Sequence, residues 1–264
     1  MQSSKRTLPV WATATVVIAG AAASLSSQVV LPAGTAATPV ARAVGAAAAV
    51  AAISTPAAPP VIALATTSPA KAVIAFASPD ELRSQLKFET VKWAGKRVQT
   101  IDETSRLMLA QAAAEKAGLN EVGLTYEDVY GVIEAETSWI PRSGLGNNGV
   151  KSHGLAQFEP GTAKGLGLKD PNDPVQAVFA AALNMKHGAE WAAGRLEPLK
   201  LAPQDYALKL REGVSVYYNL SVKGRNKWDG LNTAELPVET QRHIRNVRAG
   251  AEEAAELARQ LPDA

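Results

Sequence analysis

The chain has 264 residues, of which 47% are hydrophobic, 20% are charged and none is cysteine, so it can form a sizeable hydrophobic core in one or two domains. This composition excludes collagen-like, coiled-coil and wholly disordered proteins, and the lack of cysteine excludes disulfides, zinc–thiolate sites, iron–sulfur sites and thiol nucleophiles. Residues 1–77 contain four basic and no acidic side chains, which leaves 23 basic against 25 acidic residues from Ser78 onward, and this balance argues against nucleic acid as a partner.

The first 27 residues have the pattern of a secretory signal peptide or a membrane anchor. Lys5 and Arg6 form a basic tip, and an uncharged run from Thr7 to Ala23 follows. The apolar part of this run is shorter than the roughly 20 residues that span a bilayer, which favours a cleaved signal peptide. An uncleaved anchor remains open, because the uncharged stretch extends beyond Ala23 and the two basic residues would keep the amino terminus inside.

Residues 28–77 differ in composition from the rest of the chain and are predicted to form a linker. They are rich in Ala, Val, Pro and Thr, and their six prolines interrupt any long helix. Such a segment acts either as a semi-extended tether or as a low-complexity spacer without a further role. We place the folded domain at 78–250 and a carboxy-terminal helical tail at 251–264.

The folded domain is predicted to be predominantly α-helical, because no run of period-two alternation exceeds a few residues. Acidic residues and a glycine mark the ends of a helix over Asp102–Gly118, and a capping box at residues 125–128 starts a helix over Tyr126–Thr137. Single helices are also predicted over Asp80–Gly95 and Pro174–Leu196, one or two helices over Ala202–Tyr218, and the closing helices over Glu235–Leu261. Residues 139–158 are expected to be the one long irregular stretch, and its aromatic first and last residues are expected to pack in the core.

Glu136 is the first candidate for chemistry. Val129, Val132 and Ile133 fall on one face of the predicted helix. Glu136 continues that face, whereas Glu134 points about 200° away, with the polar face. An apolar pocket disfavours the charged form of a carboxyl group, so Glu136 is a candidate for donating a proton to a leaving oxygen. The alternative is a carboxylate at a helix end that bonds only to neighbouring polar groups.

Several motifs that follow Glu136 occur in a recognisable order. Glu136-Thr137 ends the predicted helix, and the irregular stretch leads to the sequences GLAQ at 154–157 and PGTA at 160–163. In this order they resemble the soluble lytic transglycosylase (SLT) domain family of the lysozyme-like superfamily, in which an E-S pair precedes G-L-x-Q and P-x-T-A elements. The family's D-P helix start, its Y-N pair and its closing L-P-x-E-T-R-x-Y-V element are matched by Asp170–Ala182, Tyr218-Asn219 and Leu236–Val247.

The resemblance covers most of the folded domain, from about residue 128 to residue 247, and it has departures. The substituted positions are Thr137 for serine, Leu220-Ser221 for an A-G pair, Gln241 for arginine and His243 for tyrosine. The change at Thr137 keeps a hydroxyl group, whereas the others leave the role of the loop after Asn219 open. We expect His243 to be a core or surface residue rather than a ligand.

The resemblance implies a lysozyme-like, goose-type or SLT catalytic domain, preceded by the signal or anchor segment and the Ala/Pro-rich linker. It implies cleavage of the β-1,4 bond between N-acetylmuramic acid and N-acetylglucosamine in peptidoglycan, with a 1,6-anhydromuramoyl product. A single glutamate, Glu136, would act as acid and then as base, with no cofactor and no metal.

The same resemblance places four residues at substrate-binding positions, which are Ser152, Gln157, Tyr218 and Asn219. Each also has a plain structural explanation. Gln157 would tie its loop to a helix by its amide, Tyr218 would pack as an amphipathic core residue, and Asn219 would cap a helix end.

Two other functions stay open. No Asp or Glu occurs between Glu136 and Glu159, which favours a one-carboxylate mechanism over glycosidases that use two. A muramidase or chitinase-like hydrolase would need a second acid from farther along the chain, such as Asp173, Glu190 or Asp205. A non-catalytic peptidoglycan-binding module with a vestigial glutamate is the other possibility, and the departures from the family pattern favour it.

The implied substrate and the amino-terminal segment together predict the surroundings of the protein. We expect export to the cell envelope, either into the periplasm or anchored to the inner membrane, with membrane contact only through the amino-terminal segment. Peptidoglycan glycan strands are the expected partner. An envelope-spanning assembly, such as a conjugation or secretion apparatus, or phage machinery would fit the same activity.

Overall fold

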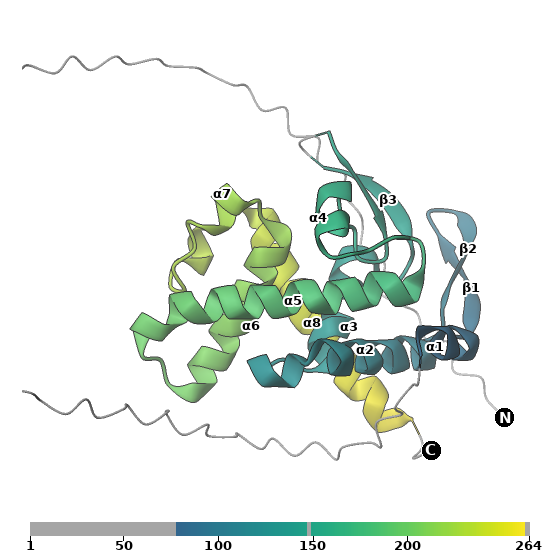
Figure 1. Ribbon diagram of the computed structural model, residues 1–264, viewed down its shortest axis with the longest axis horizontal. Coiled ribbons are helices and arrows are strands. Elements are labelled where there is room, and N and C mark those ends of the chain that lie inside the picture. Colours follow the sequence, from purple (N-terminus) through teal and green to yellow (C-terminus); the bar gives the residue numbers. More distant parts are fainter. Residues whose placement is uncertain (1–77, 147–148, 262–264) are drawn as a thin grey trace, which may run out of the picture. The chain divides into compact units, whose positions relative to one another are not determined.

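The computed structural model describes residues 78–146 and 149–261, so the predicted signal or anchor segment at 1–27 and the linker at 28–77 lie outside the described residues. The described part is mostly helical (Figure 1), which confirms the predicted predominance of α-helix. Within this part, no helix is both long enough and apolar enough to cross a membrane.

The domain begins with a short helix and a hairpin. Helix α1 (Pro79–Gln85) is followed by strands β1 (Phe88–Trp93) and β2 (Lys96–Ile101), which pair antiparallel. The prediction of one helix over Asp80–Gly95 is therefore wrong beyond α1. Two physical reasons apply: β1 contains aromatic and β-branched residues that favour strands, and Gly95 adopts a φ of +77°, which suits a tight hairpin turn.

The next two helices form where the end signals predict them. Helix α2 (Glu103–Ala117) begins after Asp102, whose carboxylate accepts a hydrogen bond from a backbone N–H, and it ends at a left-handed glycine. Helix α3 (Tyr126–Thr137) begins with the predicted capping box, in which the Thr125 N–H donates to Asp128 Oδ2 over 2.9 Å. Both predictions are confirmed.

The stretch predicted to be irregular contains a second hairpin. Strands β3 (Arg142–Leu145) and β4 (Lys151–Gly154) pair antiparallel, so the prediction is wrong for these eight residues. Each strand has four residues without apolar alternation, which explains why the sequence pattern did not reveal them. A side chain at Gly154 would place its Cβ 1.8 Å from the carbonyl oxygen of Pro171, so this strand end requires glycine.

The remaining long helices surround the core. The predicted helix over Pro174–Leu196 is confirmed as α5, which Asp173 caps by accepting from two backbone N–H groups. Helix α6 (Pro203–Asn219) and helix α8 (Val238–Gln260) are each one continuous helix, and α8 runs without a break through residues 250–251. The shorter elements are η1 (Leu119–Val122), α4 (Pro160–Gly165), η2 (Glu197–Leu199), α7 (Val222–Arg225) and η3 (Thr233–Glu235).

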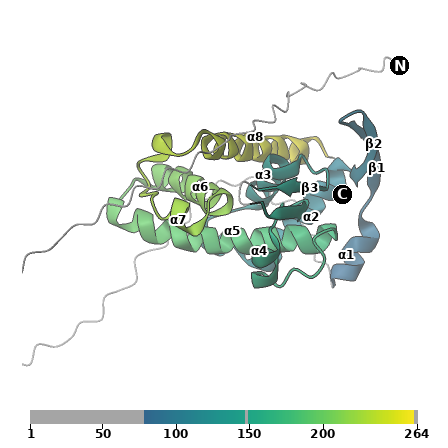
Figure 2. The ribbon, with the colours of Figure 1, turned by 90° about the horizontal axis from the view of Figure 1, so that it is seen from above.

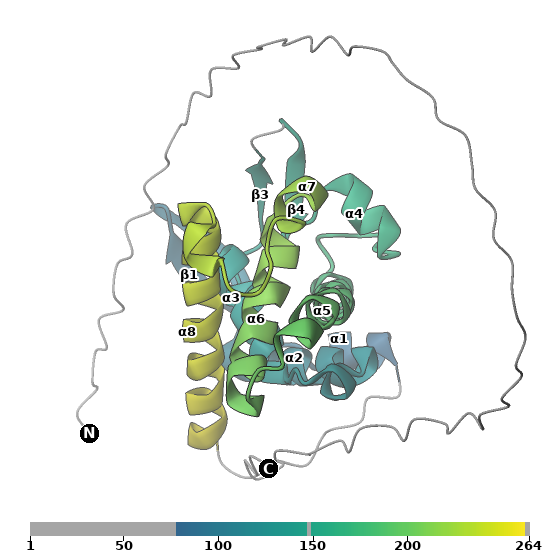
Figure 3. The same cartoon turned by 90° about the vertical axis from the view of Figure 1, so that its left-hand side faces the viewer.

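The helices of the domain pack in layers. Helix α5 packs against α2, α3 and α6, and α8 packs against α3 and α6. Figures 2 and 3 show α5 and α8 on opposite sides, with α3 and α6 between them. The first and last residues of the second-hairpin stretch, Trp139 and Phe158, are buried as predicted, and the Trp139 ring lies 5.1 Å from the Tyr130 ring.

Helices α3 and α8 approach each other at two glycines. A Cβ on Gly131 would lie 2.2 Å from the carbonyl oxygen of Val247, and a Cβ on Gly250 would lie 2.9 Å from the Gly131 Cα. The two helices are antiparallel here, because Tyr130 near the start of α3 hydrogen-bonds to Glu253 in the second half of α8, whereas a residue in the last turn of α3 contacts the first half of α8. The last turn of α3, which carries the candidate glutamate, therefore lies beside the first turns of α8.

Candidate active site

Glu136 lies in the last turn of α3, and its side chain is 17% exposed. Its Oε1 atom lies 3.0 Å from Nε2 of His243 on α8, whose side chain is 7% exposed. The contact joins residues 107 positions apart in the chain. The imidazole of His243 is therefore hydrogen-bonded to the carboxylate that the sequence identifies as the candidate for chemistry.

Sequence reasoning missed this histidine, for which it predicted a core or surface position. His243 is buried, but it also bonds to Glu136. The sequence feature that marks this residue is the replacement of the family's tyrosine by histidine in the closing motif. Its Nδ1 atom is buried and has no hydrogen-bond partner among the described residues.

The position predicted for Glu134 is wrong. Helix α8 covers that face of α3, since a Cβ on Gly250 would lie 2.9 Å from the Glu134 Cβ. Burial, followed by the negative charge of Glu253, raises the pKa of Glu134 above its ordinary value. The periodicity of α3 identified one buried face, but Asp128 through Ile133 are all buried, because other helices pack on more than one side.

Tyr218, at the end of α6, stands between the hairpin segment and the histidine. Its hydroxyl donates to the carbonyl oxygen of Ala156 over 3.0 Å. Its ring lies 5.4 Å from the ring of Phe158 and 6.2 Å from that of His243, and it is nearly parallel to the latter, at 18°. Burial, and secondarily the negative charge of Glu136, raises the pKa of Tyr218 well above its ordinary value. The phenol therefore stays neutral. The partly buried Tyr218 side chain packs against the core beside the candidate glutamate.

Gln157 has a structural role, but its side-chain amide ties its loop to the second hairpin and not to a helix. Its side-chain amide donates to the carbonyl oxygens of Arg142 and Gly154 over 2.7 and 2.8 Å, and its Oε1 accepts from the Ser152 hydroxyl over 2.9 Å. Both N–H donors and one acceptor position are used within the second hairpin. Gln157 and Ser152 thus hold strands β3 and β4 together, next to the buried residues Leu155 and Ala156.

Asn219 is the last residue of α6 and links that helix to α8. Its Oδ1 accepts a hydrogen bond of 2.8 Å from the hydroxyl of Thr240, which is fully buried. Thr240 lies one turn before His243 on α8, so this bond anchors the part of α8 that carries the histidine. The Asn219 side chain is exposed.

Two further residues position the end of α3. The Thr137 hydroxyl lies 2.9 Å from the carbonyl oxygen of Leu155, and the guanidinium of Arg142 donates to the carbonyl oxygens of Glu136 and Thr137 over 2.6 and 2.9 Å. Arg142 also lies over the Trp93 ring, 5.7 Å from its centroid. The Arg142 cation therefore lies at the negative end of the α3 helix dipole, next to Glu136. Sequence reasoning assigned no role to Arg142.

The distant acids are engaged elsewhere or lie far along their helices. Asp173 caps α5 and pairs with Arg83 over 2.7 Å. This pair and the local hydrogen bonds lower the pKa of Asp173 despite its partial burial. Asp205 lies in the first turn of α6, and 13 residues of helix rise about 20 Å before Tyr218. Glu190 is exposed on α5.

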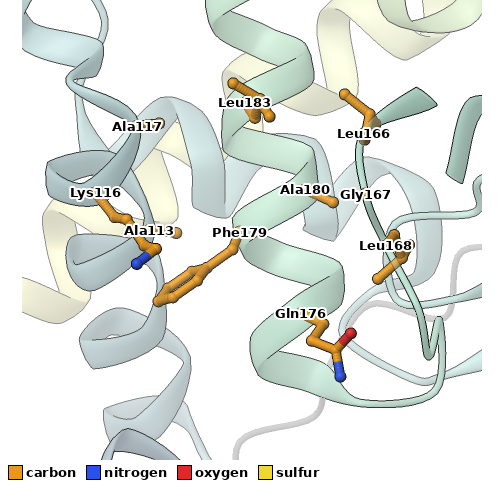
Figure 4. Close-up of a pocket in the computed structure, with 10 residues that line it drawn as sticks. All are labelled: Ala113, Lys116, Ala117, Leu166, Gly167, Leu168, Gln176, Phe179, Ala180 and Leu183. Atoms are coloured by element: carbon orange, nitrogen blue, oxygen red, sulfur yellow. The ribbon is translucent and has the colours of Figure 1, made fainter. Parts of the chain in front are cut away.

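No group of three or more His, Asp or Glu side chains within 78–146 and 149–261 is arranged to hold a metal ion. A pocket of about 280 Å³ lies between α2 and α5 (Figure 4), with a mostly apolar lining that includes Leu168 and Phe179. The residues that line this pocket are different from the candidate site residues described above.

A comparison with curated proteins finds a partial match. A segment of 62 residues is 36% identical to a protein of Enterobacteria phage PRD1 that is named a transglycosylase, and it covers 24% of this chain. The match spans 22% of the phage protein, about a fifth of its length. No protein-family model matches the chain, and no solved structure matches it significantly. The match indicates a distant similarity to a transglycosylase over part of the chain.

Proposed function

We propose that this protein is a peptidoglycan lytic transglycosylase in which Glu136 is the catalytic acid and base. The observation that carries the proposal is a partly exposed carboxylate at a helix end, hydrogen-bonded to a buried histidine and joined through Thr137 to the GLAQ segment. The order of motifs along the chain and the partial match to a phage transglycosylase support the same activity.

The reaction needs one group that can change its protonation state. Protonated Glu136 gives its proton to the oxygen between N-acetylmuramic acid and N-acetylglucosamine, and the bond from that oxygen to the muramoyl C1 breaks. The muramoyl N-acetyl group assists at C1. The Glu136 carboxylate then takes the proton of the C6 hydroxyl, whose oxygen bonds to C1, so the product is a 1,6-anhydro sugar and no water is consumed.

The surrounding residues have supporting roles in this proposal. Ser152 and Gln157 shape the hairpin that would form one wall of the substrate cleft, and Tyr218 and Asn219 would form the opposite part beside α8. Arg142 fixes the main chain at Glu136. The substrate would be glycan strands of the cell wall, and the protein would be exported to the envelope by its amino-terminal segment. A phage or an envelope-spanning assembly is the proposed biological setting.

The test is digestion of purified peptidoglycan with the full chain, followed by mass spectrometry of the soluble products. We expect muropeptides that are one water lighter than hydrolysis products. Glu136→Gln should release none, because an amide cannot donate the required proton, while it should still sediment with the cell wall. Products with reducing ends would instead identify a hydrolase with a second acid. Binding without any product from either protein would identify a non-catalytic module.

A further inference from the structure

The hydrogen bond between Glu136 and His243 constrains where the imidazole carries its proton. Nε2 faces Glu136 Oε1 at 3.0 Å, and Nδ1 is buried without a partner among the described residues. A buried N–H group without an acceptor is rare and unfavourable, whereas a bare ring nitrogen leaves only a weak acceptor unused. The favoured neutral tautomer therefore carries its hydrogen on Nε2 and donates it to Glu136.

This direction of donation distinguishes the two carboxyl oxygens. Oε1 accepts from Nε2–H when Glu136 is ionised, and it still accepts when Glu136 is protonated, provided that the proton is on Oε2. We infer that His243 is a positioning residue for Glu136, holding Oε1 so that Oε2 is the oxygen that gives and takes the proton. The inference rests on the proposed function and names the residue that orients its catalytic group.

The neighbours of the pair support a fixed imidazole. On one side the Tyr218 ring from α6 lies nearly parallel to the His243 ring, at 18°. Along α8, Thr240 bonds to Asn219 and anchors the preceding turn. On the α3 side, Arg142 from β3 binds the main-chain carbonyl of Glu136. Around neutral pH Tyr218 is uncharged and Arg142 is a cation, so neither accepts a proton from the pair.

Matched substitutions separate the hydrogen bond from mere packing. The amide nitrogen of glutamine reaches the position of a histidine Nε2, whereas that of asparagine reaches only the position of Nδ1. We expect His243→Asn and His243→Leu to lower kcat for release of anhydro-muropeptides by about 10- to 100-fold, the effect of losing one hydrogen bond to a charged group. His243→Gln should stay within about fivefold of the parent, and KM should change little in all three.

The outcomes of this experiment are distinct. The inference would be overturned if the asparagine and leucine variants were as active as the parent. It would also be overturned if the glutamine variant unfolded at the same temperature as the parent but was as impaired as the leucine variant. Failure of the proposed function has another signature, since the parent protein would then release no anhydro product at all.

A measurement independent of activity tests the tautomer directly. The chain has three histidines, and long-range ¹⁵N–¹H correlation spectra of the histidine-labelled full chain report which ring nitrogen of each is protonated. The signals of His243 are those that His243→Gln removes. We expect a proton on Nε2 of His243. A ring that carries its proton on Nδ1 alone would overturn the inference, because Nε2 could then not donate to Glu136.

Discussion

Replacing Gly131 by alanine should destabilise the domain, because it inserts a methyl group where two helices touch. The new Cβ would lie 2.2 Å from the carbonyl oxygen of Val247, and an ordinary contact of this kind is about 3.4 Å. The α8 main chain would have to move by roughly 1 Å, and a main chain yields less readily than the end of a flexible side chain.

The magnitude follows from two opposing terms. Overpacking costs about 1–3 kcal/mol, and the upper value applies when the clash is with backbone. Alanine instead of glycine within a helix returns about 1 kcal/mol. The net loss in the free energy of unfolding is about 2 kcal/mol, which lowers Tm by about 4–8 °C for a domain of this size.

Gly194 provides the matched control. It also lies within a helix, α5, but a Cβ there would meet no atom within 4 Å. Gly194→Ala should therefore raise the unfolding free energy by up to about 1 kcal/mol. Both variants are measured by thermal and urea unfolding of the full chain, followed by far-ultraviolet circular dichroism. The reasoning about the crossing is refuted if Gly131→Ala unfolds at or above the temperature of the parent.

Two further substitutions test the surroundings of the site. Burial and Glu253 raise the folded-state pKa of Glu134 above its ordinary value of 4.5, so the folded state binds more protons than the unfolded chain and its stability falls as pH rises from about 4.5. In urea unfolding, the free energy of unfolding of Glu134→Gln should equal that of the parent near pH 4 and exceed it near pH 7.5. Equal free energies at both pH values would contradict this prediction. Gln157→Ala removes hydrogen bonds to the carbonyls of Arg142 and Gly154 and should cost about 1–3 kcal/mol in urea unfolding. A raised KM with unchanged stability would instead assign Gln157 to substrate binding.

Local signals predicted the elements whose ends carry their own stabilising groups. Helices α2, α3 and α5 are preceded by the capping residues Asp102, Thr125 and Asp173, and capping hydrogen bonds form at all three helix starts. The two hairpins were not predicted, because their strands have at most six residues. The second hairpin is also held by the amide of Gln157, which no periodicity records.

The candidate site was predictable only in part, because some of its contacts join residues that are far apart in the sequence. The position of Glu136 follows from helical spacing within α3, which is local. The contact with His243 depends on how closely α3 and α8 approach, and that distance is set by Gly131 and Gly250. Arg142 likewise acts through main-chain carbonyls at the end of α3. Contacts of this kind join segments that no motif connects.

The histidine bears on the choice between an enzyme and a binding module. Departures from the family pattern at positions such as 243 favoured a vestigial site when only the sequence was considered. In the folded domain, that departure places an imidazole on Glu136 and leaves its Nδ1 buried without a partner among the described residues. An apolar side chain would fill the space without leaving a polar atom unpaired, so stability alone does not explain a histidine there. A buried imidazole that hydrogen-bonds to a partly exposed carboxylate can orient that carboxylate, which an apolar side chain cannot do, and this favours the enzyme.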